Sequence, residues 1–469
     1  MRAGQPRAPL DAALAGLSRA ADRGALWVAV AAVLAGAGGR FGRRAAMRGL
    51  LSAGLASTLA NGLLKLAVRR RRPPAVGAAA AASGLRRPST WSFPSGHAAV
   101  AAAFATGAGQ ELGVAAPALA GLAALIGWSR VRTGLHHPSD VAAGGAVGAA
   151  VALATRRLWP VAPHTPAEVR TGLAPAEAEP RPSGAGVVVV VNPSAGPGPG
   201  RRSVAEELAD ELPDAEVVEL GEGDDVVKAL TTAAERASVL GVAGGDGSVN
   251  AAAEVAARQG IPLLVVPGGT LNHFAHALGV ETVADAARGV RDGSAVAVDL
   301  ATIDGHPFLN AASVGSYVEL VDAREALEGR IGKWPAVVVA LWRVLRTTEP
   351  VPVEIDGELR RVWMVFIGNC RYHPSGFAPR WRERLDDGEL DVRIVDGSRP
   401  LARARLLTSA LTGRLARCAA YEQRFVRRLR VRSCEGPLRV ARDGETFDGA
   451  EELTVAKADE RLPVYVPRP

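Results

Sequence analysis

Two histidines in the first third of the chain stand where they could do phosphate chemistry. His97 follows Pro-Ser-Gly at the mouth of an apolar run, and His136 comes four residues before Asp140. One histidine can attack a phosphorus atom while a second donates a proton to the leaving oxygen. A carboxylate can fix the tautomer of the attacking ring. The Pro-Ser-Gly-His stretch by itself is equally typical of a plain helix start with Ser95 as N-cap, so its neighbours must decide.

Cations that could hold a phosphate lie close to both histidines in the sequence. The three polar segments are "KLAVRRRRP" from Lys65, "PSGH" from Pro94 and "SRVRTGLHHPSD" from Ser129. Arg72 and Arg130 offer bidentate forks for a tetrahedral anion, and Lys65 adds a compact charge. Gly96 lets backbone N–H groups approach the anion. This set of residues requires no metal ion.

Each polar segment lies at the end of an apolar stretch. The stretches cover about 25–39, 46–68, 97–109, 112–128 and 141–159. A helix needs about 20 apolar residues to cross a bilayer. The sequence therefore predicts an all-α transmembrane bundle of about five helices, with a soluble all-α domain as the alternative. The second stretch ends where the third begins, and the fourth ends where the fifth begins, so the three polar segments share one membrane face.

The same three segments carry a family resemblance. They fit K-x-x-x-x-x-x-R-P, P-S-G-H and S-R-x-x-x-x-x-H-x-x-x-D without a departure, and about residues 20–160 resemble the type 2 phosphatidic acid phosphatase family, which shares its site with vanadium haloperoxidases. The resemblance implies that His136 is a nucleophile forming a phosphohistidine, that His97 is the general acid, and that Asp140 orients His136. It implies that the phosphate is held by Lys65, Arg72, Ser95, Gly96 and Arg130. His137 falls outside the pattern and is interpreted as structural.

The net charge and the cysteine content indicate which binding partners and which cellular compartment to expect. The net charge of +7 fits an anionic membrane or a nucleic acid. The apolar first third favours the membrane, and the sequence shows no base-stacking platform or nucleic-acid motif, so no nucleic-acid partner is expected. Cys370, Cys418 and Cys434 are far apart and lack metal-ligand spacing. They favour a reduced compartment for the second half of the chain.

The second half is organised by glycine-rich turns. Prolines predict an extended, exposed linker over 161–185, and "GVVVVVNPSAG" then begins at Gly186. Strands alternate with helices to about residue 295, which predicts a doubly wound α/β lobe with ligands at the carboxyl ends of its strands. Three successive strand ends carry such a turn: Asn192–Gly196, Gly244–Gly247 and Pro267–Thr270. One such turn is a weak signal, but three together indicate a polyphosphate site.

The last part of the chain changes pattern. Short alternating segments from about residue 296 predict a largely antiparallel β domain, with helices at about 322–347 and 398–418. The expected domains are therefore a membrane phosphatase domain (1–160), a linker (161–185), an α/β lobe (186–295) and an antiparallel β lobe (296–469).

An ordered set of motifs carries a second resemblance. N-P-x-x-G, G-G-D-G-S-x-N, P-G-G-T-x-N-x-F-A, D-G-E-L-D-V and R-D-G-E resemble the diacylglycerol kinase catalytic family, which includes bacterial lipid kinases and sphingosine kinases. The resemblance implies that 186–295 is a doubly wound nucleotide-binding lobe, that 296–469 is a β-sandwich lobe, and that a cleft lies between them. It implies an ATP site lined by Asn192, Gly244, Gly245, Asp246, Gly247, Gly269 and Thr270. It implies Asp443 as general base with Glu445 in support, Asp387 as a metal ligand bracing the cleft, and ATP with Mg²⁺ as cofactors. His273 stands where many relatives have Asp, and Ser248 where they have Thr.

The two resemblances together predict a bifunctional lipid-phosphate enzyme. A metal-independent phosphatase hydrolyses a lipid phosphate or diphosphate, and an ATP- and Mg²⁺-dependent kinase phosphorylates a diacylglycerol-like hydroxyl. The alternatives are that one half is a membrane anchor or a nucleotide or lipid sensor, or that the second half is an NAD-type kinase. Helix parity predicts a multi-pass cell-membrane protein with the kinase half cytoplasmic and the phosphatase site facing outward. A basic loop with Arg40, Arg43, Arg44 and Arg48 is expected on the cytoplasmic side.

Overall fold

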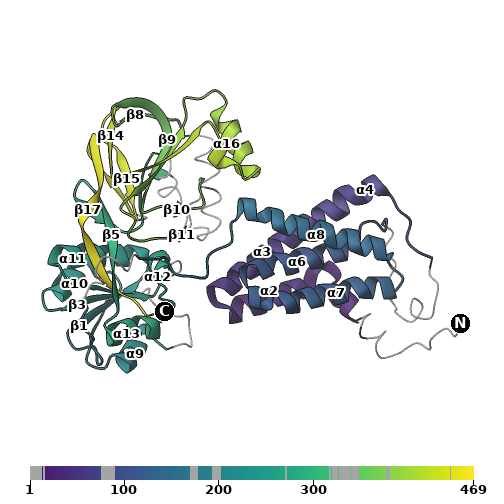
Figure 1. Ribbon diagram of the computed structural model, residues 1–469, viewed down its shortest axis with the longest axis horizontal. Helices are drawn as coiled ribbons and strands as arrows, with labels where there is room; N and C mark the ends of the chain where they lie inside the picture. The colour runs from purple at the N-terminus through teal and green to yellow at the C-terminus, as the bar shows by residue number, and fades with distance from the viewer. Residues whose placement is uncertain are drawn as a thin grey trace. The chain divides into compact units, whose positions relative to one another are not determined.

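A computed structural model describes residues 13, 16–74, 90–169, 178–192, 202–269, 272–315, 318–319, 326, 339, 348–376, 381–443 and 445–468. The chain divides into two compact units, Met1–Ala162 and Pro163–Pro469, which are described separately below (Figure 1). Thr270, the turn that follows Asn192 and most of the expected helix at 322–347 lie outside the described residues.

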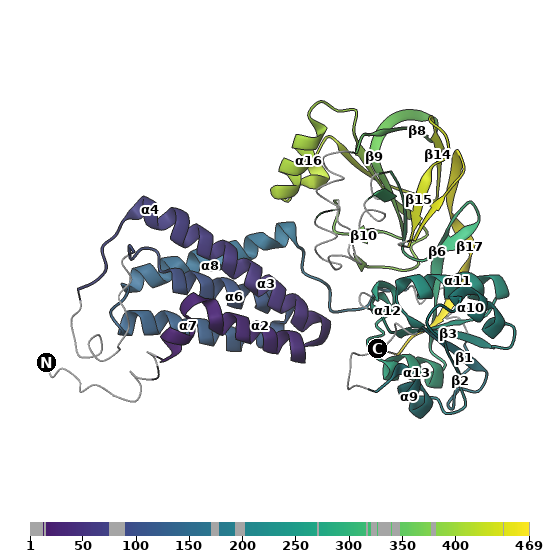
Figure 2. The same cartoon turned by 180° about the vertical axis from the view of Figure 1, so that it is seen from behind.

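The first unit is a bundle of apolar helices. They are α2 (Ala25–Ala37), α3 (Gly39–Ser57) continued by the π-helical η2 (Thr58–Leu64) and α4 (Lys65–Val68), α6 (Gly96–Glu111), α7 (Ala116–Arg132) after the short η3 (Gly113–Ala115), and α8 (Pro138–Leu158). Figure 2 shows α3, α6 and α8 running side by side. A Cβ on Gly148 would lie 2.1 Å from the carbonyl oxygen of Ala99, so small residues let α8 approach α6 closely.

Three helical segments in the described residues are long and apolar enough to cross a membrane. They are Gly39–Val68, Gly113–Arg132 and Pro138–Leu158. The helix α2 is apolar but spans only 13 residues. The expected helical membrane region is therefore confirmed as a fold, with the first and third stretches forming the shorter helices α2 and α6.

The expected basic loop is not a loop. Arg40, Arg43, Arg44 and Arg48 all lie in α3. The buried carboxylate of Glu111, at the C-terminal end of α6, accepts hydrogen bonds from Arg44 Nε at 2.8 Å and Arg48 Nε at 2.7 Å. Both guanidinium groups also lie over the ring of Trp159, just after α8. The sequence prediction was wrong because it counted the arginines as loop charges, whereas a carboxylate and an aromatic ring hold two of them within the bundle.

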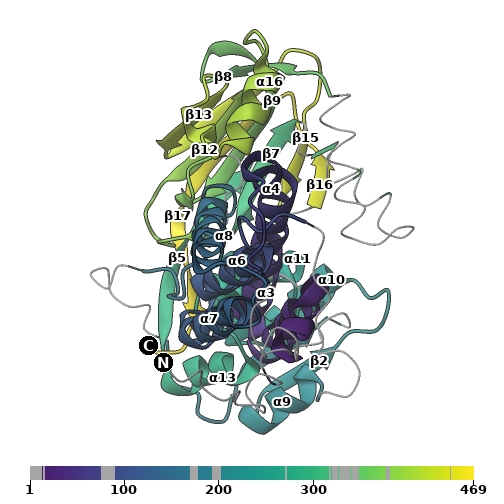
Figure 3. The ribbon, with the colours of Figure 1, turned by 90° about the vertical axis from the view of Figure 1, so that its right-hand side faces the viewer.

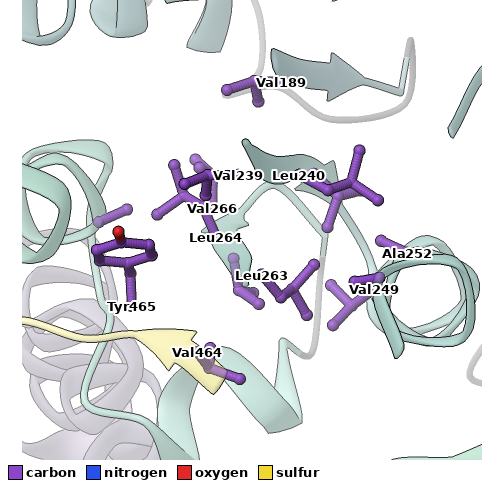
Figure 4. Packing of buried hydrophobic residues seen from close by; sticks show 14 of the residues in the cluster. Val189, Val239, Leu240, Val249, Ala252, Leu263, Leu264, Val266, Val464 and Tyr465 are labelled. Carbon is purple, nitrogen blue, oxygen red and sulfur yellow. The ribbon is translucent and has the colours of Figure 1, made fainter. Parts of the chain in front are cut away.

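The second unit begins with a parallel α/β lobe. Its strands β1 (Val187–Val191), β2 (Glu216–Glu219), β3 (Val239–Gly244) and β4 (Leu263–Pro267) lie in the order β2-β1-β3-β4. Its helices are α9 (Val204–Glu211), α10 (Val226–Ala234), α11 (Asp246–Gln259), α12 (His273–Ala277) and α13 (Val283–Asp292). All five valines of β1 are buried, as expected for a parallel strand covered on both faces. Figure 4 shows Leu240 and Leu263 of this core beside Val249 of α11.

A largely antiparallel β lobe follows. Its described strands are β5 (Ala295–Ile303), β6 (His306–Phe308), β7 (Ala311–Gly315), β8 (Val351–Ile355), β9 (Glu358–Asn369), β10 (Tyr372–His373), β11 (Trp381–Arg382), β12 (Leu390–Asp396), β13 (Tyr421–Val426), β14 (Arg428–Ser433), β15 (Arg439–Arg442), β16 (Glu445–Asp448) and β17 (Glu452–Tyr465). The helix α16 covers Ala402–Leu411. The strand β17 pairs with β5 and β14 and also runs parallel to β4, so it joins both lobes (Figure 3). The expected fold class of this half is confirmed.

Part of the expected linker is packed rather than exposed. The backbone N–H of Ala167 donates to Ala277 O at 2.8 Å, and that of Glu168 donates to Glu383 O at 2.7 Å. The hydroxyl of Tyr465 donates to Glu179 O at 3.0 Å. These linker residues form hydrogen bonds within the second unit. The exposed linker predicted from the prolines was therefore too long.

Candidate active sites

The loops before α6 and α8 bring two of the predicted motifs together. Ser95 is the N-cap of α6, and its hydroxyl accepts a hydrogen bond from Ala98 N. Its own backbone N–H donates to Asp140 O at 2.9 Å, which pairs the two loops. Gly96 packs against η2, because a Cβ there would lie 2.4 Å from Asn61 Oδ1. Asn61 was not predicted as a site residue, although a polar residue inside an apolar span is a recognisable signal.

The ring of His136 is buried and held by a backbone carbonyl. Its Nδ1 lies 2.9 Å from Ser92 O and 3.8 Å from Asp140 Oδ2. A carbonyl accepts hydrogen bonds and does not donate them, so the proton sits on Nδ1 and the lone pair on Nε2. The Nε2 atom faces Arg72 Nη1 at 3.3 Å. The geometry thus leaves Nε2, the nitrogen predicted to attack phosphorus, unprotonated.

Asp140 has other direct partners. Its Oδ1 accepts a hydrogen bond from Arg70 at 2.8 Å, and its Oδ2 accepts one from the backbone N–H of His137 at 2.9 Å. The predicted role of Asp140 in orienting His136 stays a prediction. Ser92 and Arg70, which the sequence analysis did not single out, are the direct partners of the ring and the carboxylate.

The environment of His136 keeps it neutral. Burial lowers the pKa of His136 to about 3, and the positive charges of Arg72, Arg130 and Lys65 act in the same direction. Arg72 is held in place by bonds to Leu135 O at 2.8 Å and Thr90 O at 2.9 Å. The structure therefore gathers the three predicted phosphate-binding cations around one neutral imidazole.

His97 lies between a cation and an acid. Arg130 Nη2 is 2.9 Å from its Nδ1, and Asp22 Oδ1 is 2.8 Å from its Nε2. The buried guanidinium of Arg130 also bonds to Ser18 Oγ. Neither Ser18 nor Asp22 was predicted as a site residue. Asp22 gave a signal, since it interrupts an apolar N-terminal stretch, but nothing in the sequence indicated its partner.

In the second unit, the three predicted strand ends converge. Asn192, after β1, donates through Nδ2 to Ser248 Oγ at 3.0 Å, and its backbone N–H donates to Ala243 O. The backbone N–H of Gly268, after β4, donates to Gly244 O at 3.2 Å. The ends of β1, β3 and β4 therefore meet at one edge of the sheet, where a doubly wound fold binds its ligand.

Two glycines allow this convergence. A Cβ on Gly269 would lie 2.5 Å from the Cα of Gly245, a backbone contact that cannot shift aside. The same substitution at Gly245 meets Gly269 at an ordinary 3.8 Å. Gly245 caps α11, so the backbone N–H groups at the start of that helix are presented at the turn. The turn fits a phosphate.

Asp246 and His273 lie around this turn. Asp246 is the first residue of α11, and its Oδ1 accepts a hydrogen bond from Phe274 N at 3.3 Å. His273 begins α12. Mg²⁺ binds to proteins through one or two carboxylates together with substrate phosphates, so Asp246 beside a phosphate turn fits that ion.

The two candidate base residues differ in their surroundings. Both oxygens of Asp443 are engaged, because they accept hydrogen bonds from the backbone N–H groups of Leu309, Asn310 and Ala311 at 2.7–3.0 Å. Burial nevertheless raises the pKa of Asp443 to about 6. Glu445 is exposed, and its Oε1 would lie 3.5 Å from a Cβ placed on Gly247. Glu445 therefore faces the phosphate turn, whereas Asp443 holds the backbone before β7.

The residues around Asp387 do not fit Mg²⁺. In the described part of the chain, Asp299, Cys370 and Asp387 offer ligand atoms within 4.8 Å of one another. Burial raises the pKa of the Cys370 thiol to about 12, and a thiol is a poor ligand for a hard cation. Lys457 Nζ lies 3.0 Å and Arg461 Nε 2.9 Å from Asp299. These two side chains of β17 already supply the positive charge that balances the Asp299 carboxylate.

The structure is a bundle of apolar helices followed by a unit with a parallel α/β lobe and a largely antiparallel β lobe, and family models match each of these parts. Residues 46–162 match the PAP2 superfamily, 186–303 the diacylglycerol kinase catalytic domain, and 319–463 the YegS C-terminal NAD kinase beta sandwich-like domain. The chain belongs to the diacylglycerol kinase catalytic family and carries a PAP2 domain ahead of the kinase.

Individual proteins resemble each half. The "Diacylglycerol kinase" of Bacillus subtilis is 32% identical over 202 residues, which cover 41% of this chain and 66% of that protein. A "Probable lipid kinase YegS-like" of Pseudomonas aeruginosa is 31% identical over 241 residues, 49% of this chain and 77% of that protein. The "Decaprenylphosphoryl-5-phosphoribose phosphatase" of Mycobacterium tuberculosis is 42% identical over 91 residues, 19% of this chain and 48% of that protein.

Coverage varies among the relatives. The chain spans about half the length (49%) of an uncharacterized Synechocystis relative that is 28% identical. A crystal structure of a diacylglycerol kinase from Bacillus anthracis matches 60% of this chain and 96% of that one, at 20% identity and a TM-score of 0.42.

Proposed function

We propose that the first unit hydrolyses a lipid phosphate without a metal ion, through a phosphohistidine. The observation that supports this most directly is the neutral His136, with its Nε2 lone pair among Lys65, Arg72 and Arg130. Arginine forks and a lysine can neutralise a phosphate without a bound metal. The relative from Mycobacterium tuberculosis is named as a phosphatase of a lipid-linked sugar phosphate, which fits a lipid phosphate as substrate.

The proposed reaction has two steps. The Nε2 lone pair of His136 attacks phosphorus, the bond from phosphorus to the leaving oxygen breaks, and that oxygen takes the proton of His97. A water molecule then attacks the phosphohistidine, giving a proton to His97 as the N–P bond breaks. The cations hold the phosphate oxygens through both steps.

We propose that the second unit transfers the γ-phosphate of ATP to a lipid hydroxyl. The converging ends of β1, β3 and β4 support this, because they make a phosphate turn beside Asp246. When bound, Mg²⁺ would neutralise charge on the phosphates, with Asp246 as its protein ligand. The relatives named as lipid and diacylglycerol kinases favour a diacylglycerol-like acceptor.

The surroundings of Asp443 and Glu445 favour one of them as the base. The sequence pointed to Asp443 with Glu445 in support. Three backbone donors occupy the oxygens of Asp443, whereas Glu445 is exposed at the turn. We therefore propose Glu445 as the group that takes the hydroxyl proton, with Asp443 positioning the strand that carries it.

The kinase experiment uses the detergent-purified chain with Mg²⁺, labelled ATP and a membrane lipid extract. Label should enter a lipid, and Glu445→Gln should reduce this by about 10²–10⁴-fold, as expected for a lost general base. Asp443→Asn is the paired variant. It should lower the melting temperature, because an amide cannot accept three N–H bonds, whereas E445Q should not.

The other outcomes separate the alternatives. Label that enters NAD-type nucleotides and no lipid would establish an NAD-type kinase and refute the lipid assignment. No transfer of label to any acceptor, with phosphatase activity intact, would leave the second unit a nucleotide or lipid sensor. Loss of lipid-phosphate hydrolysis in His136→Ala tests the first unit in the same preparation.

Helix parity and ATP use lead us to propose that the phosphatase site faces outward and the kinase faces the cytoplasm. The exposed Cys434 is a built-in reporter for the kinase side. In intact cells, a membrane-impermeant maleimide should label a Thr90→Cys variant and leave Cys434 unlabelled. The reverse labelling would invert the proposed orientation.

A further inference from the structure

Asn61 is a polar residue on an exposed and otherwise apolar part of a candidate membrane span. It lies within Gly39–Val68, and the same stretch exposes the side chains of Leu55, Leu63 and Leu66. Asn61 is itself exposed. A side-chain amide that faces hydrocarbon is costly unless its hydrogen bonds are made, so polar residues in such spans are commonly functional.

The amide of Asn61 lies against the phosphatase site. It is carried by the π-helical segment η2, and segments of this kind are frequent at functional sites. A Cβ built on Gly96 would lie 2.4 Å from Asn61 Oδ1 and 3.0 Å from its Nδ2. Gly96 is one of the residues predicted to hold the phosphate, and it follows the buried Ser95. Asn61 therefore lies directly beside the place where a phosphate is expected.

Ser57, Asn61 and Lys65 form a polar line along one face of the helical span. They are spaced four residues apart, so each side chain lies about one helical turn from the next. Lys65 is buried at the phosphate end of the line, where its charge helps to lower the pKa of His136. Asn61 is therefore about 5 Å along the helix from the phosphate-binding cation, on the side that leads into the membrane span.

The amide of Asn61 has hydrogen-bonding capacity to spare. Its Nδ2 donates to Ser57 Oγ at 3.2 Å, and among the residues that the structure describes this is the hydrogen bond that the side chain makes. A primary amide has a second N–H and a carbonyl oxygen. A lipid whose phosphate lies at Lys65 would bring the atoms next to its phosphorylated carbon to this amide. An ester or hydroxyl oxygen there can accept the second N–H, whereas a hydrocarbon chain cannot.

We propose that Asn61 is a specificity-determining residue that binds an ester or hydroxyl group next to the phosphorylated carbon of the substrate lipid. The proposal rests on the proposed phosphatase function of the first unit. Glycerol- and sugar-linked lipid phosphates carry such a group, and a prenyl phosphate does not. Ser57 orients the amide by accepting its other N–H. The cations then recognise the phosphate, and Asn61 recognises the group to which the phosphate is attached.

The test compares three lipid monophosphates with the purified full chain in detergent micelles. Phosphatidate carries esters, an alkyl-ether lysophosphatidate carries a hydroxyl and no ester, and a prenyl monophosphate carries neither. Asn61→Leu should lower kcat/KM by about three- to tenfold for one or both of the first two, and change it less than about twofold for the prenyl phosphate, because one hydrogen bond to the substrate is lost. The substrate whose hydrolysis falls identifies the group that Asn61 binds.

Two further variants separate recognition from packing. Ser57→Ala removes the orienting hydroxyl and leaves the contact of Asn61 with Gly96 in place, so it should shift the substrate preference in the same direction by a smaller factor. Thr58→Val is the matched control. It removes an exposed hydroxyl of the same helix that already donates to Gly54 O, so it should leave the hydrolysis of all three substrates unchanged.

The remaining outcomes would overturn the proposal. An equal loss on all three substrates in N61L would leave Asn61 as a packing residue against Gly96. Unchanged kinetics in N61L and S57A, with N61L converting a dimer to a monomer, would assign the amide to a contact between two copies of the chain. Unchanged kinetics without that conversion would refute the proposed recognition as well. A wild-type chain that hydrolyses none of the three substrates would instead refute the proposed phosphatase function itself.

Discussion

The two candidate sites, both proposed to bind phosphate, are built by different physical means. In the first unit, charged side chains form the phosphate site, with Lys65, Arg72 and Arg130 placed around a neutral His136. In the second unit, the phosphate turn is backbone, made by glycines that let strand ends approach within contact distance. The carboxylates of Asp246 and Glu445 lie beside that turn. The first site brings its own positive charge, and the second must receive it with the nucleotide.

This difference follows from what each site must bind. A phosphatase in a bundle of apolar helices can bury permanent charges at helix ends, where a lipid phosphate from the membrane reaches them. A kinase must bind and release a nucleotide at each turnover, and ATP arrives with its own divalent ion. The comparison predicts opposite responses to the same perturbations.

Removal of divalent ions should produce the largest difference. Chelation should reduce lipid phosphorylation to background, because no cation remains to neutralise the ATP phosphates. Hydrolysis of lipid phosphate by the same preparation should stay unchanged. Parallel assays with EDTA and with EDTA plus excess Mg²⁺ measure this, and a phosphatase that chelation stops would erase the contrast.

Chelation also tests whether the cluster of Asp299, Cys370 and Asp387 binds a metal ion. Because Lys457 and Arg461 already balance the charge of Asp299, EDTA without nucleotide should not shift the melting temperature of the chain. A fall that Mg²⁺ reverses would show a structural metal at Asp387, as the sequence resemblance implied.

A single added methyl group should disrupt the turn formed by Gly245 and Gly269. In Gly269→Ala, a Cβ 2.5 Å from the Cα of Gly245 forces the strand ends apart. We expect about 1–3 kcal/mol of lost stability and a large loss of ATP affinity, with phosphatase activity intact. Gly245→Ala is the matched control, since its Cβ finds an ordinary 3.8 Å contact and should leave the melting temperature unchanged. Equal tolerance of both variants would contradict the proposed close approach.

The orientation of His136 should survive loss of the Asp140 charge. Ser92 O lies 2.9 Å from Nδ1, whereas the carboxylate of Asp140 lies 3.8 Å away. Asp140→Asn should therefore cost phosphatase activity about tenfold or less. A carboxylate that fixes the histidine tautomer directly is worth about 10⁴-fold in serine proteases, so a loss of that size would restore Asp140 as the orienting group.

The smallest expected effect is on stability at acid pH. Burial raises the pKa of Asp443 to about 6, above its value of about 3.9 in an unfolded chain. The folded chain then binds the proton more tightly, so this contribution to stability is present below about pH 4 and is lost as the pH rises through about 6. Melting curves of the wild-type chain and D443N should converge across that window. A gap that widens instead would contradict the raised pKa.

Local patterns were enough to predict both folds. Apolar stretches predicted the positions of α2, α3, α6, α7 and α8, and the valine run at 187–191 predicted β1. The close approach of the catalytic loops also follows from helix parity, since consecutive helices alternate their ends. These features depend on residues near one another in the sequence.

Contacts between segments that are far apart in the sequence could not be predicted. Asp22 meets His97 across 75 residues, and Lys457 meets Asn369 across 88. The orienting partner of His136 is the carbonyl of Ser92, which any residue could supply, so side-chain identity carries no signal. Arg48 was predicted as a loop charge because nothing in the sequence indicates that Glu111 is its partner.

The most direct test of the account is to look for the covalent intermediate. The purified chain is mixed with a lipid whose phosphate is labelled, quenched during turnover under alkaline conditions and digested. The account predicts acid-labile label on the peptide containing His136, absent in H136A, and no protein-bound label when ATP and Mg²⁺ replace the lipid phosphate. Hydrolysis without a labelled peptide, or label at His136 derived from ATP, would contradict two separate phosphate chemistries in one chain.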